Sequence, residues 1–207
     1  STGLINTNNN SVSIAGIMSS TGGLTKSGLG TLTLSAANTF SGVTTLSAGI
    51  LELTNSLALQ SSPFDTLNST AGDATNGLQT ALGVLTIGGL IGNKNLADVF
   101  VTPAGGYTGI SALTLNVVGT TITRTYSGSI ADGATGMTLT KIGTGAQVLN
   151  AASSYTGATA INAGGLVVGA NDALGSTAGN TTVASGGSLG FTGGINYSTA
   201  ETIVGGG

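Results

Sequence analysis

The side chains that could carry acid–base or metal chemistry in this 207-residue chain are its seven carboxylates. They are Glu52, Asp65, Asp73, Asp98, Asp132, Asp172 and Glu201. Enzymes that cleave polysaccharides need a close pair of carboxylates or a carboxylate-rich calcium cluster. No two of these acids lie closer than 8 positions in the sequence. The spacing therefore predicts solvated loop acids rather than a catalytic pair, and it does not favour a calcium site at Asp65 and Asp73.

Other catalytic and metal-binding classes lack the residues they need. The chain has no histidine and no cysteine, which excludes Ser-His-Asp and Cys-His catalysis and thiolate or imidazole metal sites. Lys26 lies between a threonine and a serine as in a phosphate loop, but the glycine spacing before it is wrong and no helix is predicted after it. We therefore interpret Lys26, and Lys141 in the equivalent position, as turn lysines. The sequence predicts no catalytic residue, no cofactor, no metal site and no enzymatic activity.

The composition separates the chain from most soluble domains. Only 5% of the residues are charged and 37 are glycine, while the hydrophobic fraction is 40% and the net charge is −3. A chain of this kind can bury apolar surface and is not typical of disorder. The basic residues are Lys26, Lys94, Arg124 and Lys141, too few and too scattered to bind nucleic acid or an anionic membrane. The longest apolar run is also too short to insert as a transmembrane helix.

An internal repeat is the strongest pattern in the sequence. Residues from Leu24 and from Leu139 align without a gap, at a constant offset of 115 that pairs Lys26 with Lys141. We place the repeat blocks at about 24–61 and 139–176, with linking coils at 62–138 and a further coil at 177–207. Because the period is so long, each period must contain several coils of about 20–25 residues.

Within each block, short segments alternate apolar and polar residues and are separated by glycine turns, which is typical of half-buried strands. The apolar positions are predicted to face inward: Leu32, Leu34, Leu46, Leu51 and Leu53, and in the second block Gln147, Leu149, Ile161, Leu166 and Val168. Outward positions favour threonine, as in the pairs Thr31/Thr33, Thr44/Thr45, Thr121/Thr123 and Thr181/Thr182, with Glu52 on the solvent side. Uncharged rows suit strands that stack on copies of themselves, since stacked like charges repel. The pattern therefore favours an all-β solenoid, a right-handed parallel β-helix of roughly eight to ten coils with loop insertions.

Two positions in the blocks need separate interpretation. Gln147 stands where an apolar inward residue is expected, and we interpret it as a local turn. Phe40 and Tyr155 are equivalent aromatic residues; we expect them to fill a turn or a corner of the core, and a sugar-stacking platform is the alternative.

The glycine, leucine and aromatic spacing of the blocks resembles the autotransporter-associated β-strand repeat. The matching residues of the first block are Gly28, Gly30, Leu32, Leu34, Asn38, Phe40, Gly42, Thr44, Gly49 and Leu51. The second block fits with Tyr155 and Gly157, and departs at Ser153, where the repeat favours asparagine, and at Ala146 and Gln147. The resemblance implies an exported right-handed β-helix of the passenger type in a large bacterial surface protein. It implies no catalytic residue and no substrate.

These observations predict one β-solenoid segment, residues 1–207, of a longer chain. We expect a structural module, the passenger or stalk of an autotransporter-like protein, on the bacterial outer surface or outside the cell. Its expected partner is itself, through end-to-end stacking into a fibre or through continuation of the parent chain. The alternative is an adhesin that binds surface glycans through loops 68–76 and 104–109. An ice-binding or polysaccharide-degrading β-helix is less favoured.

Overall fold

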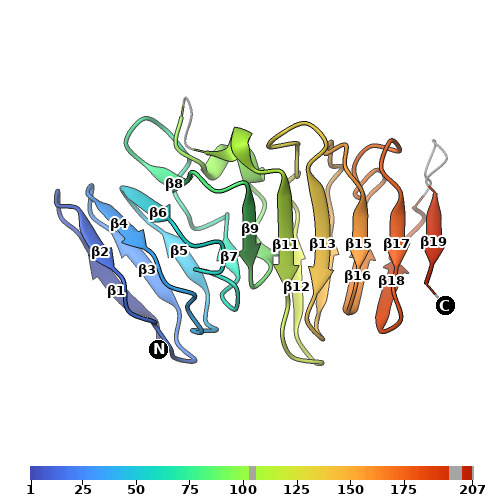
Figure 1. Ribbon diagram of the computed structural model, residues 1–207, viewed down its shortest axis with the longest axis horizontal. Coiled ribbons are helices and arrows are strands. Elements are labelled where there is room, and N and C mark those ends of the chain that lie inside the picture. Colours follow the sequence, from blue (N-terminus) through green and yellow to red (C-terminus); the bar gives the residue numbers. More distant parts are fainter. Residues whose placement is uncertain (103–105, 196–201, 207) are drawn as a thin grey trace.

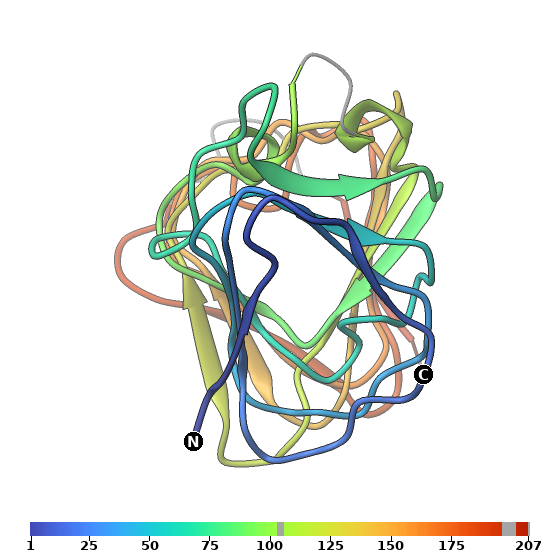
Figure 2. The same cartoon turned by 90° about the vertical axis from the view of Figure 1, so that its left-hand side faces the viewer.

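The computed structural model describes residues 1–102, 106–195 and 202–206, and it shows a solenoid of parallel β-strands. Figure 1 shows the strands side by side along the long axis, from the N-terminal end to the C-terminal end. Every strand pair among the described residues is parallel. Seen along the axis in Figure 2, the chain winds around a central core. The expected all-β solenoid is therefore confirmed.

Wall 1 of the solenoid consists of two sheets that follow each other along the axis. The first contains β1 (Gly3–Asn6), β3 (Leu24–Ser27), β5 (Thr44–Leu46), β7 (Phe64–Asp65) and β10 (Leu90–Ile91). The second contains β12 (Thr123–Tyr126), β14 (Ala146–Leu149), β16 (Gly164–Val168) and β18 (Gly187–Phe191). A bridge between Gly92 and Tyr126 joins the two sheets at a point that we call the seam. With five and four strands, wall 1 corresponds to about nine coils, within the expected range.

Walls 2 and 3 are each a regular sheet over only half of the rod. Wall 2 is a sheet in the N-terminal half, with β2 (Val12–Ile14), β4 (Thr31–Leu34), β6 (Ile50–Leu53) and β8 (Gly77–Thr80). Wall 3 is a sheet in the C-terminal half, with β9 (Val84–Ile87), β11 (Ala112–Asn116), β13 (Thr138–Ile142), β15 (Thr159–Ile161), β17 (Thr181–Val183) and β19 (Ile203–Gly205). Isolated bridges continue each sheet by one step, from Leu78 to Phe100 on wall 2 and from Ile87 to Leu59 on wall 3.

The two repeat blocks occupy different walls. The first strand of the first block is β3 on wall 1, whereas its equivalent 115 residues later is β13 on wall 3. The second strands follow the same shift, with β4 on wall 2 and β14 on wall 1. The repeat period is therefore not a whole number of coils, and the second block is turned by one wall about the axis relative to the first.

The change of wall occurs in the linking coils, where the coil length also changes. Hydrogen-bonded residues of neighbouring coils are 19 positions apart in the case of Thr33 and Glu52, but 28 positions apart in the case of Gly83 and Ser111. The extra residues form longer corners and two short 3-10 helices, η1 (Leu96–Val99) and η2 (Tyr107–Gly109). None of the helices in the described part of the chain is long and apolar enough to cross a membrane.

The core is one continuous stack of apolar side chains. The inward positions predicted from the repeat are all at most 2% exposed: Leu32, Leu34, Leu46, Leu51, Leu53, Gln147, Leu149, Ile161, Leu166 and Val168. The prediction that the paired threonines face outward is only partly right. Thr33, Thr45 and Thr123 lie on the outside, but Thr44 and Thr181 are buried at the starts of strands β5 and β17. The Thr44 hydroxyl lies 2.7 Å from the Ser62 hydroxyl, so an inward threonine is satisfied by a neighbouring coil.

Candidate functional site

Asp65 and Asp73, the two acids considered for a calcium site, each accept hydrogen bonds from the backbone of their own turn. Asp65 is 7% exposed, and its Oδ1 accepts hydrogen bonds from the backbone N–H of Leu67 (2.9 Å) and Asn68 (3.2 Å). It is thus buried, not solvated as expected. Asp73 is exposed, and the N–H groups of Thr75 (2.6 Å) and Asn76 (2.7 Å) donate to its Oδ1. These bonds, together with those from the side chains of Asn76 and Thr75, lower the pKa of Asp73 to about 2. Each carboxylate is occupied by its own turn.

Two further acids accept hydrogen bonds from threonines of neighbouring coils. Glu52 points outward from β6 and accepts a hydrogen bond from the Thr33 hydroxyl at 2.7 Å. Asp132 accepts bonds from the Thr156 N–H (2.8 Å) and hydroxyl (2.6 Å) in the next coil. Burial opposes ionisation of Asp132, but these and further backbone bonds lower its pKa overall. Within the described ranges, no three acidic side chains come together to hold a metal ion. Glu201 lies outside the described residues.

Lys26 is a structural residue in the core. Its side chain is fully buried in β3, and its Nζ donates to the carbonyl oxygens of Ser27 (3.0 Å), Gly28 (2.7 Å) and Ala48 (2.9 Å). These carbonyls lie at the corner between walls 1 and 2. The ammonium group therefore joins two consecutive coils at that corner. Lys26 is a buried strand residue and not the turn residue expected, although its side chain bonds the carbonyls of the turns.

Lys141 repeats this arrangement at the corner between walls 3 and 1. Its Nζ donates to the carbonyl oxygens of Ile142 (2.6 Å), Gly143 (2.9 Å) and Ala163 (3.2 Å). Burial lowers the pKa of Lys141 to about 8 and also lowers the pKa of Lys26. Because a buried ammonium is costly unless hydrogen-bonded, the three carbonyls make these positions tolerable for lysine.

Gln147 joins the two sheets of wall 1 at the seam. Its side chain is fully buried in β14, so the expected local turn is wrong. The backbone N–H of Leu90 donates to its Oε1 at 3.0 Å, and its Nε2 donates to the carbonyl oxygens of Leu90 (3.0 Å) and Arg124 (3.1 Å). The amide thus pairs the backbone where β10 and β12 lack a regular ladder.

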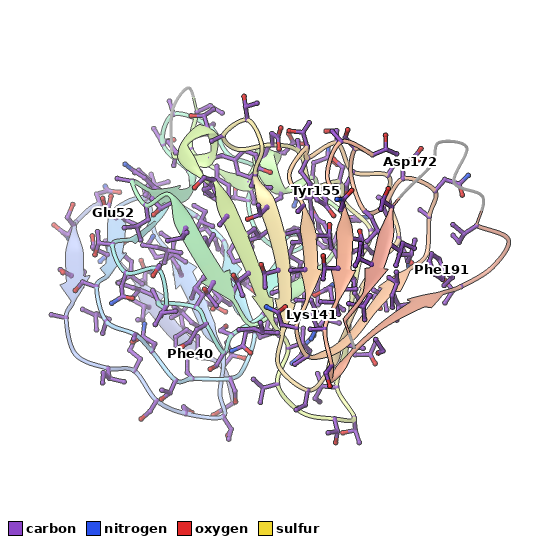
Figure 3. The ribbon with its side chains drawn as sticks, turned by 45° about the vertical axis from the view of Figure 1, so that its right-hand side comes forward. Phe40, Glu52, Lys141, Tyr155, Asp172 and Phe191 are labelled. Atoms are coloured by element: carbon purple, nitrogen blue, oxygen red, sulfur yellow. The ribbon has the colours of Figure 1, made fainter. Side chains whose placement is uncertain are left out.

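The two equivalent aromatic residues are core residues. Phe40 is 4% exposed and Tyr155 is fully buried, with its hydroxyl 2.7 Å from that of Thr159. Figure 3 shows Phe40 toward the bottom of the rod and Tyr155 toward the top, as expected for blocks turned relative to each other. Burial excludes the sugar-stacking alternative and supports the structural one.

The loops suggested for adhesion are held by internal hydrogen bonds. In loop 68–76, the Asn76 Oδ1 accepts a bond from the Gly49 N–H at 2.7 Å. In loop 104–109, residues 104 and 105 lie outside the described residues, and the Tyr107 hydroxyl donates to the Ala131 carbonyl at 2.6 Å.

A pocket of about 400 Å³ lies at the corner between walls 3 and 1. Its lining residues come from four consecutive coils: Thr39, Ser41, Ser61, Gly88, Val118, Ile122 and Arg124. The hydroxyl groups and Arg124 give it a polar side, and Val118 and Ile122 give it an apolar side. We call this the corner pocket.

Sequence reasoning missed Arg124 because it counted this residue only as one of four scattered bases. A signal was present: the alternation of exposed Thr123 and Thr125 with buried Tyr126 places Arg124 on the inward side of β12. An arginine at an inward position is unusual in a chain with so little charge, and this position indicates a candidate functional residue.

Comparisons with known proteins agree with the geometry. A family model described as the passenger-associated-transport-repeat matches residues 24–53 and 139–168. The chain is also 35% identical over 115 residues to a protein of Brucella suis biovar 1 (strain 1330) named "Adhesin BmaC autotransporter". That match spans 54% of this chain and 3% of the relative. No solved structure matches the chain.

Proposed function

We propose that this chain is a structural module of a bacterial surface passenger. Two of its segments match the passenger-associated-transport-repeat, a family that implies a surface-exposed or extracellular location. In this proposal the module is a non-catalytic stalk on the outer surface, which extends or displays other parts of a much longer protein. One observation carries the proposal: the repeat residues are used for coil-to-coil contacts, with Lys26 and Lys141 as the clearest pair.

The surface location can be tested on intact bacteria that make this protein. An epitope inserted at the exposed turn residue Ala74 should be labelled by antibody without permeabilising the cells. A second epitope at the exposed residue Asn162 provides a matched position in the other half of the rod. Labelling only after permeabilisation, at both positions, would contradict the proposal.

Stacking with a second copy is a further proposal, supported by the terminal coils. Leu4 and Ile17 are 66% and 68% exposed at one end of the described rod, and Ile203 and Val204 are 48% and 46% exposed at the other. Open strand edges with apolar side chains attract another strand. In a longer chain, the neighbouring coils of the same polypeptide would cover these residues. Sedimentation of the purified chain over a range of concentrations tests stacking: growing rods support it, and a constant monomer contradicts it.

An adhesive role is compatible with the same comparisons, since the relative from Brucella suis carries the word adhesin in its name. In a structural stalk, adhesion would come from a local feature on the rod. The corner pocket is such a feature.

A further inference from the structure

Arg124 differs from the three lysines because no group in the described part of the chain neutralises or pairs with its side chain. Lys26, Lys94 and Lys141 each donate to three carbonyl oxygens. Arg124 is half-buried, and its guanidinium makes no hydrogen bond or ion pair within the described part of the chain. Its Nε is buried without a hydrogen-bond partner, and among the described residues it is the one such side-chain atom.

An unpaired, partly desolvated cation is costly, and natural structures usually pair it with a carboxylate or a carbonyl. The stem of Arg124 lies close to the backbone of Gly89, where the lack of a side chain leaves room for it: a Cβ there would lie 3.0 Å from the Arg124 Cγ. The guanidinium thus lies at the corner pocket, and none of the residues that line this pocket is an acid. A ligand carboxylate would supply an anion, and a planar guanidinium is well suited to carboxylates.

The rest of the pocket indicates what such a ligand carries besides its charge. Thr39, Ser41 and Ser61 supply hydroxyl groups that can both donate and accept, as the hydroxyl groups of a sugar require. Val118 is 60% exposed and, with Ile122, offers an apolar surface for the C–H face of a sugar ring. The volume of about 400 Å³ is in the lower part of the usual range for small-molecule sites, which suits one or two sugar units.

The charge of the pocket favours a monoanion. Arg124 is the one charged residue in its lining, so a single carboxylate matches it, whereas a doubly charged phosphate would lack a second cation. We propose that the corner pocket binds an acidic sugar unit of a polysaccharide or glycan, with the sugar carboxylate at Arg124 and its hydroxyl groups at the serine and threonine side chains. This site goes beyond the structural role proposed above and does not depend on it.

The test is a titration of the purified 207-residue chain, followed by calorimetry or by NMR. The probes are an oligogalacturonate, for uronic acids, and sodium N-acetylneuraminate, for sialic acids; glucose, sodium acetate and sodium sulfate are the comparisons. We expect at least one acidic sugar to bind at least tenfold more tightly than all three comparisons. Which probe binds identifies the source of the carboxylate. No binding of either probe, or equal binding of acetate or sulfate, would overturn the proposal.

Two substitutions locate the site. Arg124→Gln removes the charge and should weaken binding at least tenfold, whereas Thr123→Val, on the exposed side of the same strand, should leave it unchanged. If Arg124→Gln does not fold, Val118→Glu serves as the test variant instead. Val118 is exposed, and the carboxylate introduced there would compete with the ligand carboxylate for Arg124. Val84→Glu, at a residue 50% exposed and outside the pocket, is the matched control. Unchanged binding in a folded Arg124→Gln or Val118→Glu variant would overturn the proposal.

Discussion

The ammonium groups of Lys26 and Lys141 make the same three hydrogen bonds, 115 residues apart and at different corners of the solenoid. Lys26 joins walls 1 and 2, and Lys141 joins walls 3 and 1. The repeat therefore specifies a local corner and the strands beside it, independently of the wall on which it lies. This independence is what a passenger needs if it is extended by repetition.

Removing a buried lysine should destabilise the rod although the new residue is apolar. Lys141→Met fills similar space but leaves three carbonyl oxygens without their donor, and an unsatisfied buried group costs about 1–3 kcal/mol. We expect the free energy of unfolding to fall by at least about 2 kcal/mol in urea titrations. Thr140→Val, the outward neighbour in β13, should change it by less than about 0.5 kcal/mol. Equal stability of Lys141→Met and the unmodified chain would show that the carbonyl contacts contribute little.

Stability should also depend on pH in alkaline solution. The pKa of Lys141 is about 8 in the folded chain and 10.5 ordinarily, so between these values the unfolded chain holds more protons. The free energy of unfolding should therefore rise as the pH increases from about 8.

Above pH 10 the sign reverses. Burial raises the pKa of Tyr107 and Tyr126 above the ordinary value of 10.0, so only the unfolded chain ionises there. Urea titrations from pH 7 to 11 should show a maximum between about 9 and 10. In Lys141→Met the rise above pH 8 should be reduced, because only the smaller contribution of Lys26 remains. A stability that falls steadily from pH 7 would contradict this assignment.

Restoring an apolar residue at Gln147 should weaken the seam. Gln147→Leu introduces the residue that stands at the equivalent position 32, yet it leaves the backbone N–H and carbonyl of Leu90 without partners. We expect a loss of about 1–3 kcal/mol and faster hydrogen exchange at Leu90. Gln147→Glu should also destabilise, because a carboxylate cannot donate to the carbonyl oxygens of Leu90, Arg124 and Val148. Protection of Leu90 that is unchanged in Gln147→Leu would refute the role of the amide.

The corner glycines should tolerate alanine unequally. Gly49 and Gly186 both have positive φ, 73° and 92°, so alanine is strained at each. At Gly49 an added Cβ would also overlap the carbonyl oxygens of Gly28 and Gly30, whereas at Gly186 nothing lies within 4 Å. Gly49→Ala should therefore lower the melting temperature clearly more than Gly186→Ala does. Equal decreases in the melting temperatures of the two variants would mean that backbone strain alone accounts for both.

Much of the fold was readable from the sequence because it is local. Alternation in Leu32, Leu34, Leu51 and Leu53 specifies inward and outward faces, and a near-absence of charge favours stacked strands. The turn of the second block by one wall was not readable, since it depends on the accumulated length of irregular corners in residues 62–138. No local pattern reports the wall to which a strand returns.

The candidate site could not be predicted for a related reason. The lining of the corner pocket comes from residues as far apart as Thr39 and Arg124, which meet only because successive coils stack. Gln147 is an exception to the apolar pattern of the sequence, but its partner Leu90 is 57 residues away, on the other side of the seam. In both cases the contact crosses the linking coils, where the repeat provides no register.

The central claim is that this chain is one continuous structural rod, with wall 1 unbroken across the seam. Ile91 in β10 and Thr125 in β12 should be neighbours on the outer side of wall 1, since the adjacent residues Gly92 and Tyr126 are bridged. The chain has no cysteine, so Ile91→Cys combined with Thr125→Cys can be treated with a short bismaleimide. We expect a nearly complete intramolecular cross-link, and little in the control pair Ile91→Cys and Thr114→Cys, where Thr114 lies on wall 3. No cross-link between positions 91 and 125, or equal yields in the two pairs, would contradict the continuous rod.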